Sequence, residues 1–161
     1  MRTFRPRIGT MILTACGIGL IPVAPGTCGS AVTAVLIGLL VHSSLGAMNG
    51  WIVGAVIVIL WPISLTALRS IKTGGRLDHP WIVIDEVIGM GVTLLPALFL
   101  HRASWKIVAI GFVLFRIFDI AKPFGIRAID RKNTPTSVLL DDLVAGIFSA
   151  VLLAIVMVSV A

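Results

Sequence analysis

Long apolar runs separated by short polar stretches make up most of the chain. No Lys, Arg, Asp or Glu occurs from residue 8 to residue 68, which is enough chain for about three membrane spans of roughly 20 residues each. Further apolar runs follow at residues 87–100 and 107–121 and after the acidic pair at 141–142. The pattern predicts an all-α, polytopic membrane helical bundle with about four to six membrane segments, in a single domain covering residues 1–161.

The breaks between the apolar runs set the expected elements. We expect helices at 31–48 and 51–68, from Pro80 to Leu100, at 107–121 and at 141–161. The apolar segment 8–22 is short for an upright span and is interpreted as re-entrant or interfacial. The loop 22–30, PVAPGTCGS, contains prolines that break helix and glycines that permit turns. It is either a hinge between helices or a phosphate-holding loop in which Thr27 or Ser30 caps the next helix.

Composition agrees with a membrane location. The chain is 58% hydrophobic and 12% charged, with a mean hydropathy of +1.09, far from the averages of soluble domains. The 13 Lys and Arg residues give a net charge of +6, yet they stand in short clusters at the ends of apolar runs. That distribution is typical of positive-inside anchoring and disfavours nucleic acid as a partner. Cys16 and Cys28 have no His neighbours and are expected to be free thiols.

The cation clusters also predict the topology. The basic N-terminus, the turn containing Arg69, Lys72 and Arg76, and the loop 123–137 are expected on the cytoplasmic side. The neutral turn between the second and third apolar runs is expected on the opposite side. A helix that begins near Pro80 would then place Asp85 close to the cytoplasmic interface.

All seven acidic residues lie between positions 78 and 142. Asp85 and Glu86 interrupt an apolar run, and ionised groups in such a place mark a functional site by default. Asp85 precedes Gly89 by four residues, and Asp142 precedes Gly146 by four residues. Two helices packed through these glycines would bring the carboxylates face to face, although coincidence in a Gly-rich chain is the alternative.

Several carboxylates at one membrane interface require a cation, and Mg²⁺ fits oxygen ligands of this kind. We therefore predict a magnesium site formed by Asp85, Glu86, Asp141 and Asp142. Nearby cations would complement the phosphates of a phospholipid headgroup, and Arg116, Asp119 and Lys122 share one helix face by their spacing. The alternative is that the pairs Arg116–Asp119 and Arg127–Asp130 are salt-bridged anchors at the interface. The predicted substrate-binding residues are Thr27, Ser30, Arg116, Lys122 and Arg127, and the predicted catalytic carboxylates are Asp130 and Asp119.

Five ordered motifs carry a resemblance to a known family. They are GIGLIPVAPGTCGS (17–30), IVIDEVIGM (82–90), FRIFDIAKP (115–123), IRAIDR (126–131) and LLDDLVAGI (139–147). Together they resemble the phosphatidylglycerophosphatase A family. The resemblance implies a magnesium-dependent enzyme of the bacterial inner membrane, multi-pass and with its active site facing the cytoplasm. Such an enzyme removes the terminal phosphate from phosphatidylglycerophosphate in phosphatidylglycerol synthesis. Two departures, Gly125 and the segment 133–137, affect loop shape and no carboxylate.

Other classes fit the residues less well. CDP-alcohol phosphatidyltransferases begin their motif with Asp-Gly, a pair this chain lacks. Histidine-based lipid phosphatases need a motif that His42, His79 and His101 do not provide. A small transporter for a cation or phosphate is the remaining alternative, but it would need carboxylates near mid-bilayer. The sequence leaves open whether one or two metals bind, whether hydrolysis is direct or covalent, and whether a homo-oligomer forms.

Overall fold

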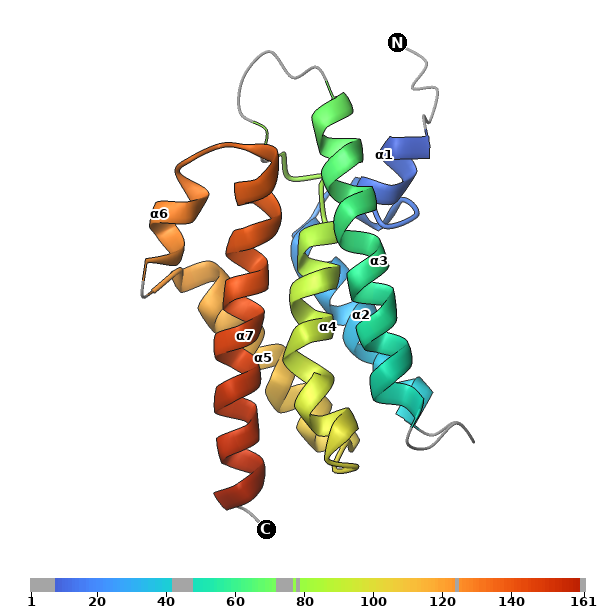
Figure 1. The fold of residues 1–161 in the computed structure, drawn as a ribbon, viewed down its shortest axis with the longest axis vertical. Helices are drawn as coiled ribbons and strands as arrows, with labels where there is room; N and C mark the ends of the chain where they lie inside the picture. The colour runs from blue at the N-terminus through green and yellow to red at the C-terminus, as the bar shows by residue number, and fades with distance from the viewer. Residues whose placement is uncertain (1–7, 42–47, 72–76, 78, 124, 160–161) are drawn as a thin grey trace.

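The architecture was obtained as a computed structural model, which describes residues 8–41, 48–71, 77, 79–123 and 125–159. These ranges contain helices and no strand, which confirms the all-α prediction for the described residues (Figure 1). The elements are α1 (Ile8–Leu13), η1 (Ile18–Leu20), α2 (Pro25–Val41), α3 (Met48–Ser70), α4 (Ile84–Phe99), α5 (Trp105–Ala121), α6 (Ile126–Asp130) and α7 (Pro135–Ser159).

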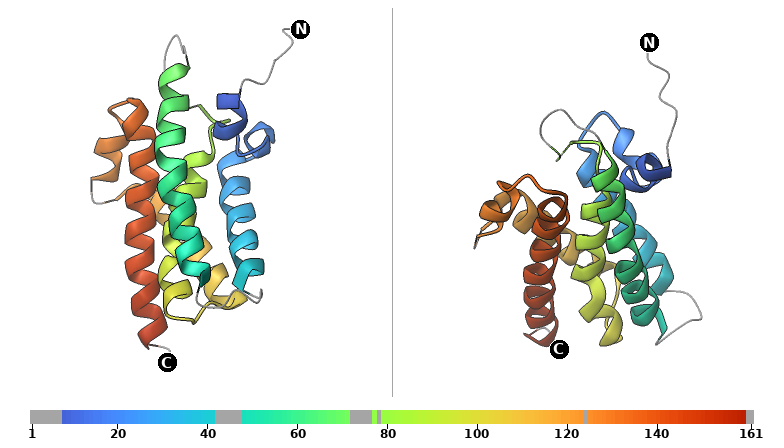
Figure 2. Two further views of the ribbon diagram at one scale, coloured as in Figure 1. Left: turned by 45° about the vertical axis from the view of Figure 1, so that its right-hand side comes forward. Right: turned by 45° about the horizontal axis from the view of Figure 1, so that its top comes forward.

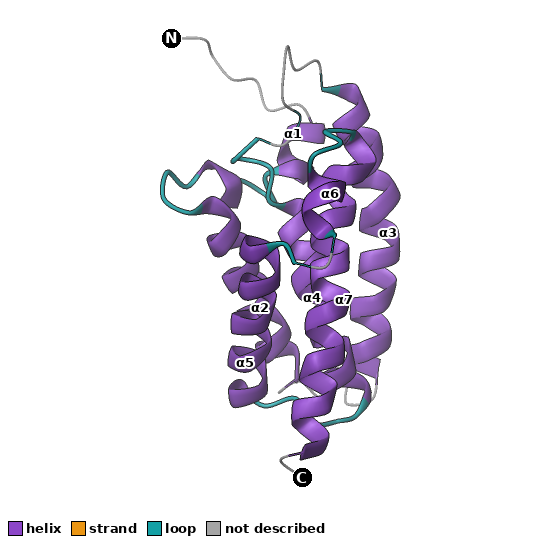
Figure 3. Cartoon of the chain, turned by 90° about the vertical axis from the view of Figure 1, so that its left-hand side faces the viewer, coloured by secondary structure: helices purple, strands orange, loops and turns teal. Residues whose placement is uncertain are grey.

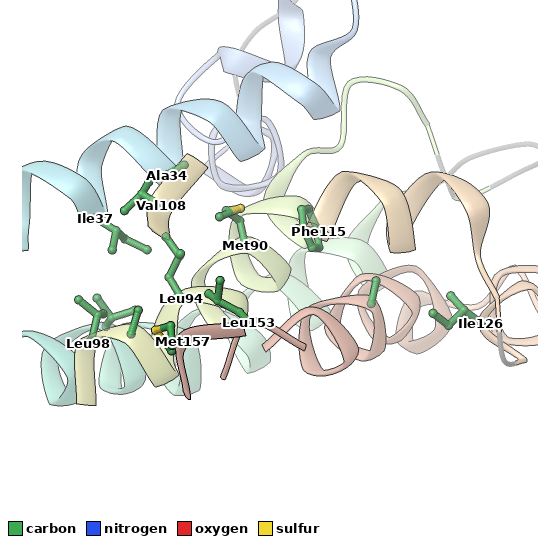
Figure 4. Packing of buried hydrophobic residues seen from close by; sticks show 13 residues of the cluster. Ala34, Ile37, Met90, Leu94, Leu98, Val108, Phe115, Ile126, Leu153 and Met157 are labelled. Atoms are coloured by element: carbon green, nitrogen blue, oxygen red, sulfur yellow. The ribbon is translucent and has the colours of Figure 1, made fainter. Parts of the chain in front are cut away.

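Helix α4 lies at the centre of the bundle and packs against α2, α3, α5 and α7. Helices α2, α3, α4 and α7 run roughly parallel to the long axis of the bundle, as Figure 2 shows from two further directions. Ile88, Met90 and Leu94 of α4 are fully buried, and Leu94 joins residues of α2, α5 and α7 in the main apolar cluster (Figure 4). The central helix therefore positions its acidic residues relative to all of its neighbours.

Helices α4 and α7 approach each other closely. A Cβ atom added to Gly89 would lie 2.6 Å from the carbonyl oxygen of Asp142, and one added to Gly146 would lie 2.5 Å from that of Gly89. The Thr93 hydroxyl donates to the Gly89 oxygen at 2.9 Å and also reaches the Gly146 oxygen at 3.4 Å. The two backbones are thus in contact, and the packing expected from the repeated Asp-to-Gly spacing is confirmed.

The direction of the helices gathers the polar residues at one end. Helices α2, α4 and α7 begin at the end of the bundle drawn uppermost in Figure 1, whereas α3 and α5 finish there. Figure 3 shows the same end from the side, with the short helices α1 and α6 both near it. Asp85 and Glu86 in the first turn of α4, and Asp141 and Asp142 near the start of α7, consequently share this end.

Two predicted helix starts were wrong by six residues each, those of α2 and α7. Helix α2 begins at Pro25 and not at residue 31, since proline is pre-organised for the first helical position. Thr27 and Ser30 therefore lie inside the helix and do not cap it. Helix α7 begins at Pro135 and not at Asp141. Thr134 and Ser137 exchange backbone-to-hydroxyl hydrogen bonds of 2.8 and 3.1 Å, a reciprocal cap that starts the helix early.

Smaller differences concern the first segment and α4. The segment 8–22 forms only α1 and η1, because Ala15, Cys16 and Gly17 adopt φ values of 45°, 58° and 100°. This left-handed turn divides the segment 8–22 into two short pieces, neither of which is long enough to span a membrane. Helix α4 begins at Ile84, four residues later than predicted. The predictions for the basic N-terminus, the 42–47 turn, Lys72, Arg76 and Asp78 lie outside the described residues.

Two of the described helices, α3 and α7, are long and apolar enough to cross a membrane, and α2 is a shorter apolar helix. This is fewer than the four to six segments expected. Large apolar side chains are nevertheless exposed on several helices, among them Leu36 of α2, Val58 of α3, Val113 of α5 and Val151 of α7. Apolar surface of this extent is rare on monomeric soluble proteins, so the outer faces of the bundle suit an apolar surrounding.

The α4–α7 contact yields a stability prediction. Gly146→Ala would place a methyl group against the Gly89 carbonyl, and we expect this overpacking to lower the free energy of unfolding by about 1–3 kcal/mol. Thermal unfolding of the detergent-purified protein, followed by circular dichroism, measures the effect. Gly54→Ala is the matched control, because a Cβ atom there would meet nothing within 4 Å. Equal melting temperatures for the two variants would contradict the proposed contact.

Candidate metal and phosphate site

Three carboxylates meet where α4 and α7 approach each other. Asp85, Glu86 and Asp142 each offer an oxygen within 4.8 Å of the others. Asp85 and Asp142 are only 6% and 5% exposed. Each of these aspartates precedes its contact glycine by one helical turn, so the close approach of the backbones brings the carboxylates together. We call Asp85, Glu86 and Asp142 the acidic cluster.

The acidic cluster has the properties of a cation site. Among the described residues, no Lys or Arg forms an ion pair with any of its members. Glu86 Oε2 is buried without a hydrogen-bond partner. Buried carboxylates without compensation are strongly unfavourable, and hard divalent cations prefer such oxygen ligands. The donor set therefore fits a metal ion of the magnesium or calcium type.

Asp141, the fourth predicted ligand, is directed elsewhere. Its Oδ2 accepts a hydrogen bond of 2.5 Å from Lys122 Nζ, and it is not part of the acidic cluster. Adjacent residues of a helix point about 100° apart, which explains why Asp141 and Asp142 have different partners. The sequence did not reveal this difference.

Arg116 lies beside the acidic cluster. Its Nη1 is 2.6 Å from Asp119 Oδ2 and donates to Ser30 Oγ at 3.3 Å. Ser30 in turn donates to the Gly26 carbonyl at 2.8 Å. Arg116 is close enough to Glu86 for their charges to attract, and its Nε is buried without a partner. The guanidinium is thus held in place, and its Nε–H group remains available as a hydrogen-bond donor.

The first turn of α2 forms another wall of the site. A Cβ atom on Gly26 would collide with Glu86 Oε1, so the Glu86 carboxylate rests directly against this turn. Thr27 is half-buried in the same turn. The first N–H groups of a helix have no partners within it and attract anions. Together with Arg116, this turn provides donors beside the acidic cluster.

Lys122 joins two further carboxylates. Its Nζ is 3.0 Å from Asp130 Oδ1 and 2.5 Å from Asp141 Oδ2. Burial alone would lower the pKa of this ammonium, but the hydrogen bonds and charges of Asp141 and Asp130 outweigh it, and the pKa of Lys122 is raised. Arg127 is exposed, and its Nη2 donates to the Ala121 carbonyl at 3.1 Å, at the end of α5.

The chain matches known proteins over most of its length. The family model for phosphatidylglycerophosphatase A matches residues 11–157. The chain belongs to the phosphatidylglycerophosphatase A family. This match includes every residue of the acidic cluster and every predicted site residue.

Bacterial relatives agree with the family. The chain is 36% identical over 146 residues to the phosphatidylglycerophosphatase A of Escherichia coli, covering 87% of the chain and 78% of the relative. It is 34% identical over 144 residues to that of Haemophilus influenzae, covering 88% and 83%. A Bacteroides thetaiotaomicron protein, provisionally named a phosphatidylinositol-3-phosphatase, is 32% identical over 146 residues, covering 90% and 91%. No solved structure matches the chain.

Gly26 is the site residue that sequence reasoning missed in this family member. The sequence suggested that Gly26 permits a turn in the loop 22–30, but only the structure shows that Gly26 faces Glu86. A signal for this contact was present in the sequence. Gly26 directly follows Pro25, the first residue of α2, and a helix does not need a glycine at that position. Its use is close approach and not backbone freedom.

Gly26→Ala tests the wall formed by α2. We expect activity to fall about 10- to 100-fold, because displacing a ligand or positioning group by about 1 Å is costly for catalysis. Stability should change little, since the clash is with the flexible end of Glu86. Initial rates and melting temperatures are measured together, with Gly9→Ala as control, where the added Cβ would make an ordinary 3.6 Å contact. Full activity in Gly26→Ala would show that Glu86 need not occupy this position.

Proposed function

We propose that the protein removes the terminal phosphate from phosphatidylglycerophosphate, giving phosphatidylglycerol and inorganic phosphate. The observation that carries this proposal is the acidic cluster beside Arg116, in a chain of the phosphatidylglycerophosphatase A family. A phosphate monoester at a lipid headgroup presents oxygens that require both a cation and hydrogen-bond donors. The described site offers carboxylates for the former and Arg116 with the first turn of α2 for the latter.

The proposed cofactor is Mg²⁺, held by Asp85, Glu86 and Asp142. When bound, it would supply charge neutralisation and Lewis-acid polarisation of the phosphate. Arg116 would bind a phosphate oxygen, with Asp119 and Ser30 holding the guanidinium in place. Thr27 and the N-terminus of α2 would hold further oxygens, as helix starts do for phosphates.

Hydrolysis consumes one water molecule. The water oxygen bonds to phosphorus while the ester P–O bond breaks, and a proton ends on the departing glycerol oxygen. A carboxylate that takes the water proton must lie beside the acidic cluster, and Asp119 lies near enough to Asp142 for their charges to repel. We therefore assign the role of general base to Asp119. Asp130 has less support in a catalytic role, because it lies on α6 beside Lys122.

The proposed location is the bacterial inner membrane, with α2, α3, α4, α5 and α7 as five spans. At 1.5 Å per residue the 16-residue α4 is about 24 Å long, so its first turn would lie near the headgroups of a bilayer with a core of about 30 Å. Among the described residues, the end of the bundle that holds the site also carries Arg69, Arg131 and Lys132. This distribution favours the cytoplasmic side.

Two other activities bear on the proposal. The Bacteroides thetaiotaomicron relative favours phosphatidylinositol 3-phosphate as a second candidate substrate, and its phosphate monoester has the same chemistry. Transport of a cation or phosphate is less well supported, because the acidic cluster lies at the end of the bundle and not at mid-depth.

Phosphate release by the purified protein tests the function. Phosphatidylglycerophosphate and phosphatidylinositol 3-phosphate are presented in mixed micelles, with Mg²⁺, with Ca²⁺ or with chelator. We expect Mg²⁺-dependent release from phosphatidylglycerophosphate, and a fall of at least about 100-fold in Asp85→Asn and Asp142→Asn, because these carboxylates would hold the cation that balances charge at the reacting phosphate. Preferential release from phosphatidylinositol 3-phosphate would support the second candidate. No release from either lipid with any divalent metal would contradict the phosphatase assignment.

Cysteine labelling in intact cells tests the topology. In a variant with Cys16 and Cys28 replaced by serine, a cysteine at Lys132 should be inaccessible to a membrane-impermeant maleimide added from outside. A cysteine at Lys106, in the first turn of α5 at the other end of the bundle, is the matched control and should be labelled. Labelling at Lys132 and protection at Lys106 would place the site on the opposite side of the membrane.

A further inference from the structure

Lys122 connects three elements that are separate in the sequence. It is the residue directly after α5, and its ammonium contacts Asp130 at the end of α6 and Asp141 in the second turn of α7. The side chain is one-fifth exposed. Two donors of the ammonium are thus engaged by carboxylates at 3.0 and 2.5 Å.

The backbone at Lys122 is unusual for a lysine. It adopts φ 45° and ψ 53°, the left-handed conformation that ends helices and that glycine normally occupies. Pro123 follows and prevents the helix from continuing. A side chain at such a position is unfavourable unless it contributes elsewhere. The two ion pairs are the contribution that the structure shows.

The position of Asp141 shows why its ion pair with Lys122 matters. Asp141 is 5% exposed and near enough to Asp85 and Asp142 for their charges to repel. Lys122 places a positive charge on this carboxylate, and the loss of that charge would increase the negative charge beside the acidic cluster. Removing one partner of a buried ion pair leaves the other charge uncompensated, and this is more damaging than removing both.

We propose that Lys122 is a positioning residue that neutralises Asp141 and ties α6 to α7, and that it does not bind the substrate phosphate. This inference rests on the proposed phosphatase function. It assigns different roles to the adjacent residues Asp141 and Asp142. Asp142 faces the acidic cluster, whereas Asp141 anchors the lysine. Among the described residues, the phosphate-binding role then falls to Arg116, which lies close to both the acidic cluster and α2.

A double-mutant cycle of Lys122→Met and Asp141→Asn tests the inference. We expect Lys122→Met to lower kcat about 100-fold, as misplacement of a neighbouring ligand does, with KM little changed. The double variant should recover to within about 10-fold of wild type, because coupled pairs are non-additive. Its melting temperature should also exceed that of Lys122→Met. Lys132→Met, at an exposed lysine of the same end, is the matched control and should behave as wild type.

Three results would overturn the inference. One is a double variant that fails to fold or is as inactive as Lys122→Met; another is a raised KM with kcat preserved in Lys122→Met; the third is wild-type behaviour of Lys122→Met. Failure of the proposed function is recognised separately, because the wild type would then release no phosphate from either lipid. The melting temperatures of the four proteins still test the pair in that case, and additive losses would contradict it.

Discussion

The contact between Gly89 and Gly146 is the constraint on which the site depends. With any larger residue at either position, α4 and α7 would separate, because the added carbon would meet the backbone of the other helix. The aspartates one turn earlier are carried into the same space by this contact. Packing energy between helices thus holds together carboxylates that would otherwise repel one another. This arrangement favours a bound cation, because the clustered carboxylates repel one another in its absence.

The remaining charges are arranged around this contact in two groups. Arg116 is held by Asp119 and Ser30 and faces the acidic cluster, while Lys122 is held by Asp130 and Asp141 on the side of α6. The starts of α2, α4 and α7 share this end, and their dipoles favour negative charge there. An anionic headgroup would therefore meet donors from α2 and α5 beside a metal bound between α4 and α7.

Much of this arrangement could be predicted from residue patterns, and what could not has identifiable causes. The helical class follows from apolar runs too long and uniform for strands, and the α4–α7 contact follows from the repeated Asp-to-Gly spacing. The early starts of α2 and α7 were missed because they depend on Pro25 at a first helical position and on the Thr134–Ser137 cap. The ion pair of Asp141 with Lys122 was missed because it depends on the left-handed backbone of Lys122 at the end of α5, which no periodicity indicates.

Equilibrium binding of Mn²⁺, followed by electron paramagnetic resonance of the free ion, tests the central claim most directly because it needs no substrate. We expect saturable binding by the wild type that Mg²⁺ displaces, and binding weakened at least about 10-fold in Asp142→Asn, since the acidic cluster loses one of its three charges. Asp130→Asn, outside the acidic cluster, should bind as the wild type does. Equal Mn²⁺ affinity in the wild type and in Asp142→Asn would contradict the claim that α4 and α7 form a metal site between them.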